Sequence, residues 1–258
     1  MNEILRPLVV LPTYNERDNL SRLIPAILGI HPALHVLVVD DSSPDDTAGL
    51  VEQLRQALPC KRLFLEIRNG KLGLGSAYVH GFRWGLERGY DFFIEMDADW
   101  SHQPKYLAQM LALGLEVDFV VGSRYVPGGG TLNWWLGRKI LSRGGSLYSR
   151  LILGVKISDL TGGFNGWRAE VLRSVSLESM HSEGYSFQVE LKYRATQRGF
   201  RHAEFPIIFD ERRAGKSKMS ASIAYEAVWK VWSFRLWESR HRKDRPKESD
   251  TYPSRIHS

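Results

Sequence analysis

The stretch Phe92-Phe93-Ile94-Glu95-Met96-Asp97-Ala98-Asp99 joins an apolar run to two carboxylates that one small residue separates. The run predicts a buried strand, and the aspartates fall where that strand should end. Residues i and i+2 of a strand point to the same side, so both carboxylates can reach one hard cation. Mg²⁺ or Mn²⁺ held by carboxylates together with substrate phosphates is a common arrangement. Asp97 and Asp99 are therefore candidate metal ligands.

Strand and helix signals alternate through the first half of the chain. The predicted strands are 8–11, 36–39, 63–67, 92–96 and 117–121. The predicted helices cover about 18–29, 43–58, 75–88 and a segment that begins at Pro104. Continuous apolar strands that alternate with helices are typical of a mostly parallel sheet with helices on both faces. The sequence therefore predicts an α/β fold with a Rossmann-like sheet.

The second half is less regular and falls into three parts. After the glycine-rich joint 127–130, the sequence favours helices at about 134–153, 185–198 and 219–238, a loop at 161–164 and a strand at 203–209. We divide the chain into an α/β domain at 1–218, an aromatic amphipathic helix at 219–240 and a basic tail at 241–258. The tail is polar enough that we expect it to be disordered.

Basic side chains concentrate in two regions. Residues 119–158 contain six Lys/Arg and no Asp or Glu, and residues 210–258 contain twelve basic and seven acidic side chains. Such regions indicate contact with phosphates, nucleic acid or membrane lipid. No nucleic-acid-binding motif accompanies them, so we expect no nucleic-acid partner.

Composition sets further limits. The single cysteine, Cys60, excludes an intrachain disulfide. No stretch of eighteen apolar residues occurs, so we predict no transmembrane helix, and the first residues lack the pattern of a signal peptide. The aromatic residues of 219–238 fit either packing on the sheet or contact with a membrane interface, and we leave both open.

Polar groups follow four of the predicted strands. They are Pro12–Glu16, Asp40–Asp41, Asp97–Asp99 and Gly122–Tyr125. Ligands of an open parallel sheet bind beyond the carboxyl ends of its strands, so these groups can meet at one cleft. There the Tyr14 ring could stack on a base, an acid could bind a ribose, and Arg124 could add charge to a diphosphate. Each group alone fits ordinary loop chemistry, but the four together favour a nucleotide site.

Other segments leave alternatives open. Gly70–Gly75 lacks the spacing of a phosphate-binding loop, so we favour a tight turn into a helix, with Lys71 near the ligand. His102 could be a metal ligand, but a lone loop histidine is more often a surface residue, and we favour the surface. Ser101 lies on the same side as Asp99 and could approach the metal. The basic segment 212–218 is either a solvated turn or a loop that closes over a diphosphate, and we favour closure.

Seven stretches, taken in order, resemble glycosyltransferase family 2 with the GT-A fold, and most closely its polyprenol-phosphate (dolichol-phosphate) mannose synthase branch. The stretches are Leu11–Leu20, Val38–Asp45, Lys71–Tyr78, Met96–His102, Gly122–Tyr125, Ile140–Gly144 and Ser158–Phe164. The first and fourth alone would indicate only the broad family. The resemblance extends over about residues 8–218 and implies that 1–218 is a GT-A catalytic domain.

The resemblance also implies a site for GDP-mannose. The residues implied to hold its guanosine part are Pro12, Tyr14, Glu16, Val39 and Asp41. Asp97 and Asp99 would bind Mg²⁺ or Mn²⁺, with Ala98 beside the nucleotide. Arg124, Arg212 and Lys218 would bind the donor phosphates, and Asp99 and Arg124 are the candidate catalytic residues. Ser142 and Arg143 are the candidates for the acceptor phosphate.

The family position of Ser101 carries a glutamine in some relatives, where it is a metal ligand, so a third ligand at Ser101 stays open. Some relatives also have C-terminal membrane spans that this sequence lacks. The chain resembles the type without spans, which implies a peripheral position on the cytoplasmic face of a membrane, held by surface attachment or by a small membrane-anchoring subunit.

The implied reaction transfers mannose from GDP-mannose to a polyprenyl or dolichyl phosphate. In-line attack would invert the anomeric centre and give a β-linked lipid product. A phosphate monoester is already anionic at neutral pH, since its second pKa is about 6, so no strong general base is required. One alternative is a related transferase that uses UDP-glucose or another acceptor. Another is a nucleotide-binding membrane adaptor without catalysis, against which the intact aspartate pair argues.

Overall fold

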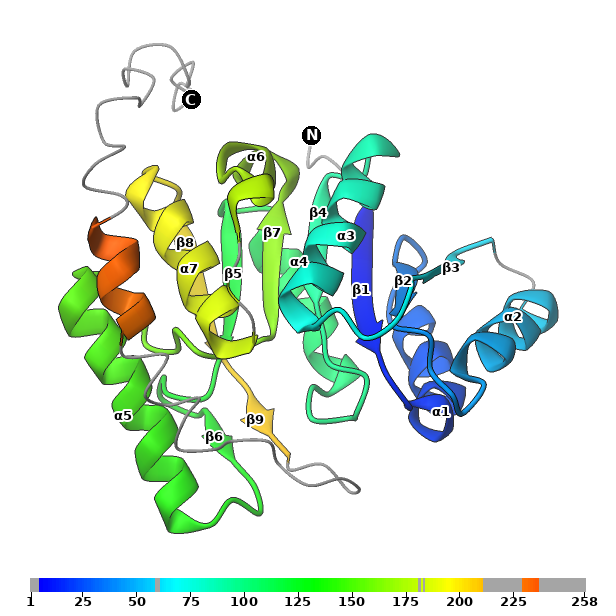
Figure 1. Ribbon diagram of the computed structural model, residues 1–258, viewed down its shortest axis with the longest axis horizontal. Helices are drawn as coiled ribbons and strands as arrows, with labels where there is room; N and C mark the ends of the chain where they lie inside the picture. The colour runs from blue at the N-terminus through cyan, green and yellow to red at the C-terminus, as the bar shows by residue number, and fades with distance from the viewer. Residues whose placement is uncertain (1–4, 59–60, 181, 183, 211–228, 237–258) are drawn as a thin grey trace.

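A seven-stranded sheet with the order β3-β2-β1-β4-β7-β5-β8 forms the centre of the molecule (Figure 1). The computed structural model describes residues 5–58, 61–180, 182, 184–210 and 229–236. The strands of the sheet are β1 (Pro7–Thr13), β2 (His35–Asp40), β3 (Leu63–Ile67), β4 (Phe92–Glu95), β5 (Phe119–Ser123), β7 (Asn165–Arg168) and β8 (His202–Pro206). β6 (Gly130–Thr131) and β9 (Ile208–Phe209) form a separate parallel pair.

Helices cover both faces of the sheet, which confirms the predicted α/β fold. They are α1 (Arg17–Leu28), α2 (Thr47–Ala57), α3 (Leu74–Glu87), α4 (Leu107–Gly114), α5 (Leu136–Leu153), α6 (Ala169–Ser174), α7 (Gly184–Gln197) and the 3-10 turns η1 (Pro104–Tyr106) and η2 (Leu177–Ser179). Alternate residues of β1 explain the two layers. Leu8 and Val10 pack in a core with α3, α6 and α7, whereas Val9 and Leu11 pack in a second core with α1 and α4.

The direction of the strands gathers their polar ends. β1 pairs in parallel with β2 and β4, and β5 runs in the same direction as β4 because both are antiparallel to β7. The carboxyl ends of β1, β2, β4 and β5 therefore lie at one edge of the sheet. This is the edge where an open α/β sheet binds its ligands.

β7 was missed by the sequence analysis. It is the only antiparallel strand of the seven, and it is inserted between β4 and β5. Its four residues include Gly166 and two polar residues, so the sequence contains no apolar run that would predict a strand here. The glycine is needed for packing, since a Cβ at Gly166 would lie 2.5 Å from the ring of Phe92.

The start of the second predicted helix was also wrong. Residues 43–46 form a loop, and α2 begins at Thr47. The Asp45 carboxylate accepts hydrogen bonds from the backbone and hydroxyl of Thr47 and from the backbone N–H of Arg17. The acidic residues that suggested a helix start therefore tie the loop to the beginnings of α1 and α2. The predicted strand at 203–209 is likewise divided into β8 and β9.

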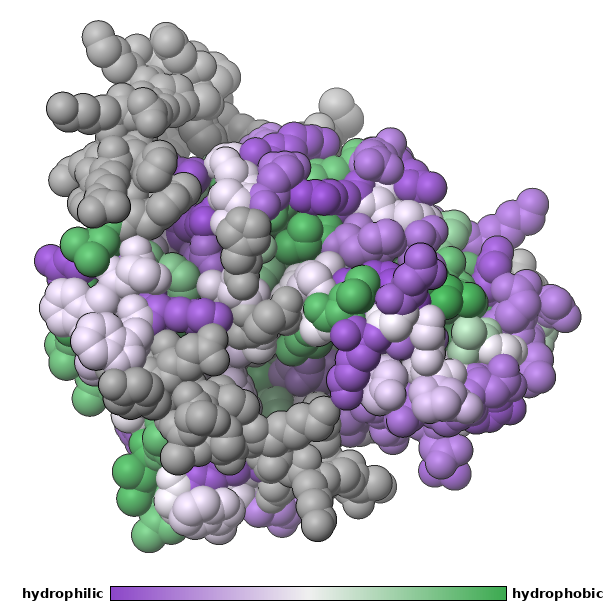
Figure 2. Space-filling view, viewed as in Figure 1, coloured by the Kyte–Doolittle hydropathy of each residue, from purple (hydrophilic) through white to green (hydrophobic). Residues whose placement is uncertain are grey.

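The C-terminal part of the chain is described only at 229–236, which is helical, as predicted for this part of 219–238. This segment packs beside α5, where Val231 and Phe234 contact the core and the Arg235 guanidinium donates to the Ile152 carbonyl. Apolar side chains also line the outer edge of the molecule that α5 forms (Figure 2). The predicted tail at 241–258, with the rest of the predicted helix, lies outside the described residues.

Within the described part of the chain, no helix is both long and apolar enough to span a bilayer.

Candidate functional site

The ends of β1 and β2 place an aromatic ring beside a cation. Tyr14 follows β1 and is 38% exposed, and the Nζ of Lys71 lies 3.9 Å from its ring centroid. Lys71 belongs to the turn that precedes α3, where Gly73 adopts a positive φ of 99° that an L side chain rarely allows. The predicted turn is therefore confirmed, and it brings Lys71 to the same edge of the sheet as Tyr14.

Asp41 fixes that turn to the sheet. Its carboxylate is buried, accepts from the Nε of Arg68 at 2.6 Å and lies 2.5 Å from the Arg68 Nη2. The same carboxylate accepts from the backbone N–H of Leu72 at 3.0 Å. Much of the hydrogen-bonding capacity of the Asp41 carboxylate is thus used within the protein. Its partner Arg68 was not identified from the sequence.

Four other residues are implied for the nucleotide, and they differ in the groups that they expose to it. Val39 is fully buried in the core, and Pro12 is its neighbour in the parallel register. Ala98 is also buried, in the core on the other face of the sheet. A nucleotide contact with Val39 or Ala98 would therefore come through the backbone. Glu16 precedes α1, and its carboxylate accepts from the side-chain amide of Asn19 at 2.7 Å.

The two aspartates lie just past the end of β4 with different exposure. The side chain of Asp97 is 25% exposed, whereas Asp99 is buried. Asp99 accepts from the backbone N–H of Ser101 at 3.0 Å and from its hydroxyl at 2.5 Å. The negative charges here also affect the buried Tyr78. Burial raises the pKa of Tyr78, and the carboxylates of Asp97, Glu95 and Asp99 raise it further.

The oxygen atoms that the side chains offer at the end of β4 suit a hard divalent cation. Asp97 and Asp99 supply carboxylate oxygens, and Ser101 adds a hydroxyl that is held against Asp99. Among the described residues, no group of three or more His, Cys, Asp or Glu side chains is arranged to hold a metal ion. A cation held by the two aspartates would therefore need oxygens from the substrate to complete its coordination.

His102 is buried, so the prediction that it lies at the surface is wrong. Its ring packs against Phe164 and Phe209, with centroids 5.1 and 5.3 Å away, and its Nδ1 accepts from the backbone N–H of Asp97 at 3.0 Å. Burial lowers the pKa of His102 to about 4, although the charge of Asp99 opposes this shift. His102 is therefore neutral at pH 7, and its Nδ1 is engaged in fixing the Asp97 backbone.

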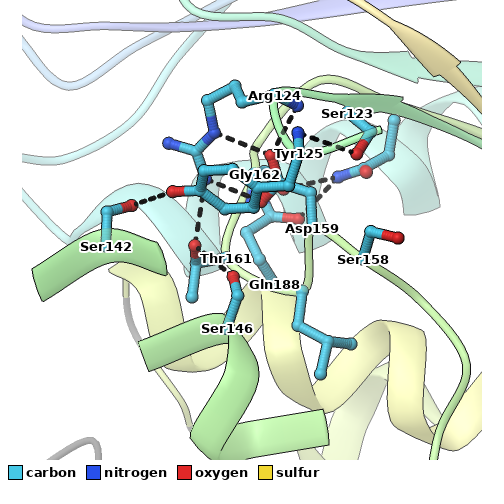
Figure 3. A network of polar contacts seen from close by, with 12 residues as sticks. Ser123, Arg124, Tyr125, Ser142, Ser146, Ser158, Asp159, Thr161, Gly162 and Gln188 are labelled. Atoms are coloured by element: carbon cyan, nitrogen blue, oxygen red, sulfur yellow. Dashed lines mark hydrogen bonds and ion pairs between the residues drawn. The ribbon is translucent and has the colours of Figure 1, made fainter. Parts of the chain in front are cut away.

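Arg124 forms a buried ion pair with Asp159 (Figure 3). The Asp159 carboxylate accepts from the backbone N–H of Arg124 at 3.0 Å, from its Nε at 2.7 Å and from its Nη2 at 2.7 Å. Nη2 also donates to the Thr161 hydroxyl at 3.0 Å. Burial alone would lower the pKa of Arg124, but Asp159 outweighs this and raises it. Arg124 is thus a fixed cation whose charge Asp159 largely balances.

The loop that carries Asp159 is held from below by Lys192 of α7. The buried Lys192 Nζ donates to the carbonyls of Asp159, Leu160 and Gly162 at 3.1, 3.2 and 2.6 Å. Burial lowers the pKa of Lys192 to about 8, against the pull of the Asp159 and Glu95 carboxylates. Three converging carbonyls and one ammonium group therefore fix the loop 159–162 beneath Arg124.

Tyr125 links this network to α5. Its hydroxyl donates to the buried Ser142 Oγ at 2.7 Å, and Ser146, one turn further, lies 3.2 Å from the Thr161 hydroxyl (Figure 3). Burial raises the pKa of Tyr125, although the charges of Arg124 and of the exposed Arg143 oppose this rise. The predicted acceptor residues Ser142 and Arg143 are therefore brought next to Arg124.

Trp134, just before α5, has two guanidinium groups near its ring. The Cζ of Arg124 lies 5.5 Å from its ring centroid and that of Arg138 lies 4.1 Å from it. Arg138 is thus a second cation beside Arg124 that the sequence analysis did not single out.

Asp99 also lines a cavity of about 310 Å³. The other residues that line this cavity are Asp18, Asn19, Arg22, Trp100, Gln103 and Asp210.

The predicted site residues thus separate into three sets. The first two lie along one edge of the sheet: a nucleotide set near Tyr14 and Asp41, and a set around Asp97, Asp99, Arg124 and Ser142. The third set, Arg212 and Lys218, lies outside the described residues. Asp159 and Lys192 were missed, because they are 35 and 68 positions from Arg124 and no spacing connects them.

Comparison with known proteins places this geometry in a family. The model of the family "Glycosyl transferase family 2" matches residues 8–176. Polyprenol monophosphomannose synthase of Mycolicibacterium smegmatis is 47% identical over 241 residues, which cover 93% of this chain and 89% of that protein. Undecaprenyl-phosphate mannosyltransferase of Micrococcus luteus is 45% identical over 237 residues, which cover 91% of this chain and 97% of that protein.

Solved structures of glycosyltransferases share the fold. A glucosyl-3-phosphoglycerate synthase of Mycobacterium tuberculosis in complex with Mn²⁺, UDP-glucose and phosphoglyceric acid has a TM-score of 0.62 at 16% identity, and the match covers 89% of this chain and 79% of that chain. A mannosyltransferase of Pyrobaculum calidifontis in complex with GDP-Man and Mn²⁺ has a TM-score of 0.54 at 16% identity, covering 91% and 75%. The predicted GT-A fold is thereby confirmed, and the chain belongs to glycosyltransferase family 2.

Proposed function

We propose that this protein transfers mannose from GDP-mannose to a polyprenyl phosphate. Two relatives at 45–47% identity over more than nine-tenths of the chain carry names that describe this type of product or acceptor. The observation that carries the proposal is the arrangement of the site. The Asp97–Asp99 pair lies at the same sheet edge as the Arg124, Tyr125 and Ser142 contacts, which suits a donor diphosphate next to an acceptor phosphate.

The donor would lie across the ends of β1, β2 and β4. Tyr14 offers an exposed ring to the base, and Lys71 beside it offers a positive charge. Asp97 and Asp99 would hold Mg²⁺ or Mn²⁺, which when bound neutralises charge on the leaving diphosphate. Arg124, Arg212 and Lys218 are proposed to add positive charge to the same phosphates.

The acceptor phosphate would approach from the side of α5. Arg124, which is proposed for the donor phosphates, borders this side through Tyr125 and is held in place by Asp159, so it offers a preorganised N–H donor rather than a mobile charge. Ser142 and Arg143 supply a hydroxyl and a guanidinium group, and Arg138 lies close by. Because the phosphate nucleophile is already anionic, the reaction needs no base, which agrees with the buried His102, whose pKa is low and whose Nδ1 already accepts from the Asp97 backbone. In-line displacement would invert the anomeric centre and give a β-linked product.

The main rival keeps the fold but uses another sugar or acceptor. Its support is the likeness to a glucosyl-3-phosphoglycerate synthase crystallised with UDP-glucose, but at 16% identity that likeness concerns the fold alone. The adaptor alternative predicts binding of the nucleotide sugar without transfer. Both rivals are separated from the main proposal by the same assay.

The test is to incubate the purified protein with GDP-mannose, Mg²⁺ and a short polyprenyl phosphate, and to identify the lipid product by mass. We expect a product heavier by one hexose, and a matched incubation with UDP-glucose should give much less. Equal transfer from UDP-glucose would support the rival donor. Tight binding of GDP-mannose without product on any lipid phosphate would support the adaptor.

A lipid acceptor also implies a place of action. We propose a peripheral position on the cytoplasmic face of a membrane, held by the protein surface or by a small membrane-anchoring subunit. Support comes from the polyprenyl substrates in the names of the two relatives and from the basic regions of the sequence.

A further inference from the structure

Two polar side chains lie beneath the site, in the core between the sheet and α7. Glu95 is the last residue of β4 and Asn165 is the first of β7, and they are opposite each other in the pairing of these strands. Both are fully buried. Phe93 is two residues before Glu95, so it points to the same face of the sheet, where it belongs to the apolar core. A carboxylate therefore stands at a position of β4 that favours an apolar side chain.

The side chain of Asn165 joins three segments. Its Nδ2 donates to the Glu95 Oε2 at 2.6 Å, to the Gln188 Oε1 at 2.8 Å and to the Gly162 carbonyl at 3.1 Å. A side-chain amide has only two N–H groups, so the three acceptors share them. The acceptors belong to β4, to α7 and to the loop 159–162, and Gly162 and Gln188 lie beside Asp159 in Figure 3. One buried amide thus ties together parts of the protein that are distant in sequence.

This link runs between the two charged parts of the site. At one end, the aspartates of 97–99 follow Glu95 by two and four positions. At the other end, Gly162 belongs to the loop whose Asp159 holds the Arg124 guanidinium. The Gly162 backbone N–H also donates to the Asp159 carboxylate at 2.9 Å, so a shift of Gly162 would disturb the partner of Arg124.

Keeping a carboxylate in this core is unfavourable unless it is hydrogen-bonded and paired with an opposite charge. Here Asn165 supplies a hydrogen bond to Glu95, and the buried Lys192 ammonium supplies the charge. Apolar side chains of similar size would fill the same space, and such replacements of buried polar groups are often neutral or stabilising. What the polar pair adds is a directional link between segments, which apolar side chains do not supply.

We propose that Asn165 is a positioning residue that fixes the aspartates of 97–99 relative to Arg124. Its amide holds the end of β4 and the loop 159–162 at the spacing at which a metal-bound diphosphate also meets the guanidinium group. Because Asn165 is fully buried, it acts through Glu95 and Gly162 and not by touching the substrate. This inference rests on the proposed function in taking the ligand to be a nucleoside diphosphate with Mg²⁺ or Mn²⁺.

The test uses calorimetry on the full chain and compares binding of GDP with Mn²⁺ to binding of GMP without metal. Asn165→Ala should weaken Mn²⁺–GDP binding and lower kcat, each about 10–100-fold, as is typical when a residue that supports a metal site is removed. GMP lacks the β-phosphate and should bind as it does to the wild type. The matched control Glu190→Gln weakens another buried ion pair of α7, in which Arg194 also bonds to two backbone carbonyls, and it should leave both affinities unchanged.

A second variant keeps the test decisive if Asn165→Ala does not fold. The exchanged pair Glu95→Gln/Asn165→Asp keeps the total charge and one hydrogen bond between β4 and β7, because the new glutamine amide can donate to the new carboxylate. It removes the N–H that position 165 gives to the Gly162 carbonyl. Circular dichroism should therefore match the wild type, whereas the affinity for Mn²⁺–GDP should fall as in Asn165→Ala.

The outcomes separate the positioning role from the proposed function. A wild type that binds Mn²⁺–GDP but transfers nothing to a polyprenyl phosphate would refute the proposed function, and the affinities of the variants would still decide the role of Asn165. Folded Asn165 variants that bind Mn²⁺–GDP as tightly as Glu190→Gln does would overturn the positioning role. So would an equal loss of GMP binding, which would indicate general damage to the nucleotide site, and so would a wild type whose affinity for GDP does not depend on Mn²⁺.

Discussion

Removing the partner of Arg124 tests how the site is preorganised. The variant Asp159→Asn keeps the size of the side chain but removes its charge. The Asp159 carboxylate accepts from the backbone N–H, Nε and Nη2 of Arg124, and also from the backbone N–H of Gly162. An asparagine amide can satisfy only part of this set, and it leaves a buried guanidinium without its counter-charge.

The expected cost follows from that geometry. Breaking a buried ion pair by removing one partner typically costs about 3–5 kcal/mol, out of a total stability of about 5–15 kcal/mol. For a chain of this size, each kcal/mol lowers the melting temperature by about 2–4 °C, so we expect a decrease of roughly 6–20 °C. Transfer activity should also fall, because Arg124 would no longer be held in place beside the donor phosphates.

The double variant Arg124→Met/Asp159→Leu separates stability from activity. Replacing both charges by apolar side chains is often neutral, so its melting temperature should recover most of the loss. Its transfer activity should stay low, because Arg124 is absent. Thermal unfolding followed by circular dichroism and the mannosyl transfer assay provide the two measurements. If Asp159→Asn melted within about 2 °C of the wild type, the pair would not hold the site as argued.

Three further changes probe other parts of the structure. Asp99→Ala should abolish transfer and weaken Mn²⁺ binding in the presence of GDP, as measured by calorimetry, while circular dichroism stays unchanged; normal turnover would contradict the metal role. Lys192 binds fewer protons in the folded than in the unfolded protein between about pH 8 and its ordinary pKa of 10.5, so stability should rise with pH in that window, and Lys192→Met should remove this rise in urea unfolding at pH 8 and pH 10; parallel pH profiles would refute the assignment. Gly166→Ala should cost about 1–3 kcal/mol, because its Cβ would lie 2.5 Å from the Phe92 ring, whereas the matched change Gly144→Ala in the open part of α5 should be neutral or stabilising by up to about 1 kcal/mol; equal effects in chemical denaturation would show that the close approach is not real.

The fold was largely predictable because its signals are local. Continuous apolar runs marked β1 to β5, and the polar residues after them marked the edge where the site lies. β7 was not predicted, because a four-residue strand that contains Gly166 is too short to show hydrophobic periodicity. It is a strand because it pairs with β4 on one side and β5 on the other. The burial of His102 was not predicted, because it results from packing against Phe164 and Phe209, which come from distant parts of the chain.

Local sequence patterns were enough to predict the sheet and to place Asp97 and Asp99 at the end of a strand, because hydrophobic periodicity and the alternation of side chains along a strand act over a few residues. Two features became visible only in the folded structure: Asp159 balances the charge of Arg124, and α5 turns its serines inward but Leu136, Leu147 and Leu151 to solvent. Ion pairing and burial are set by which segments meet in space. A single sequence does not show which of its distant residues come into contact in the folded protein.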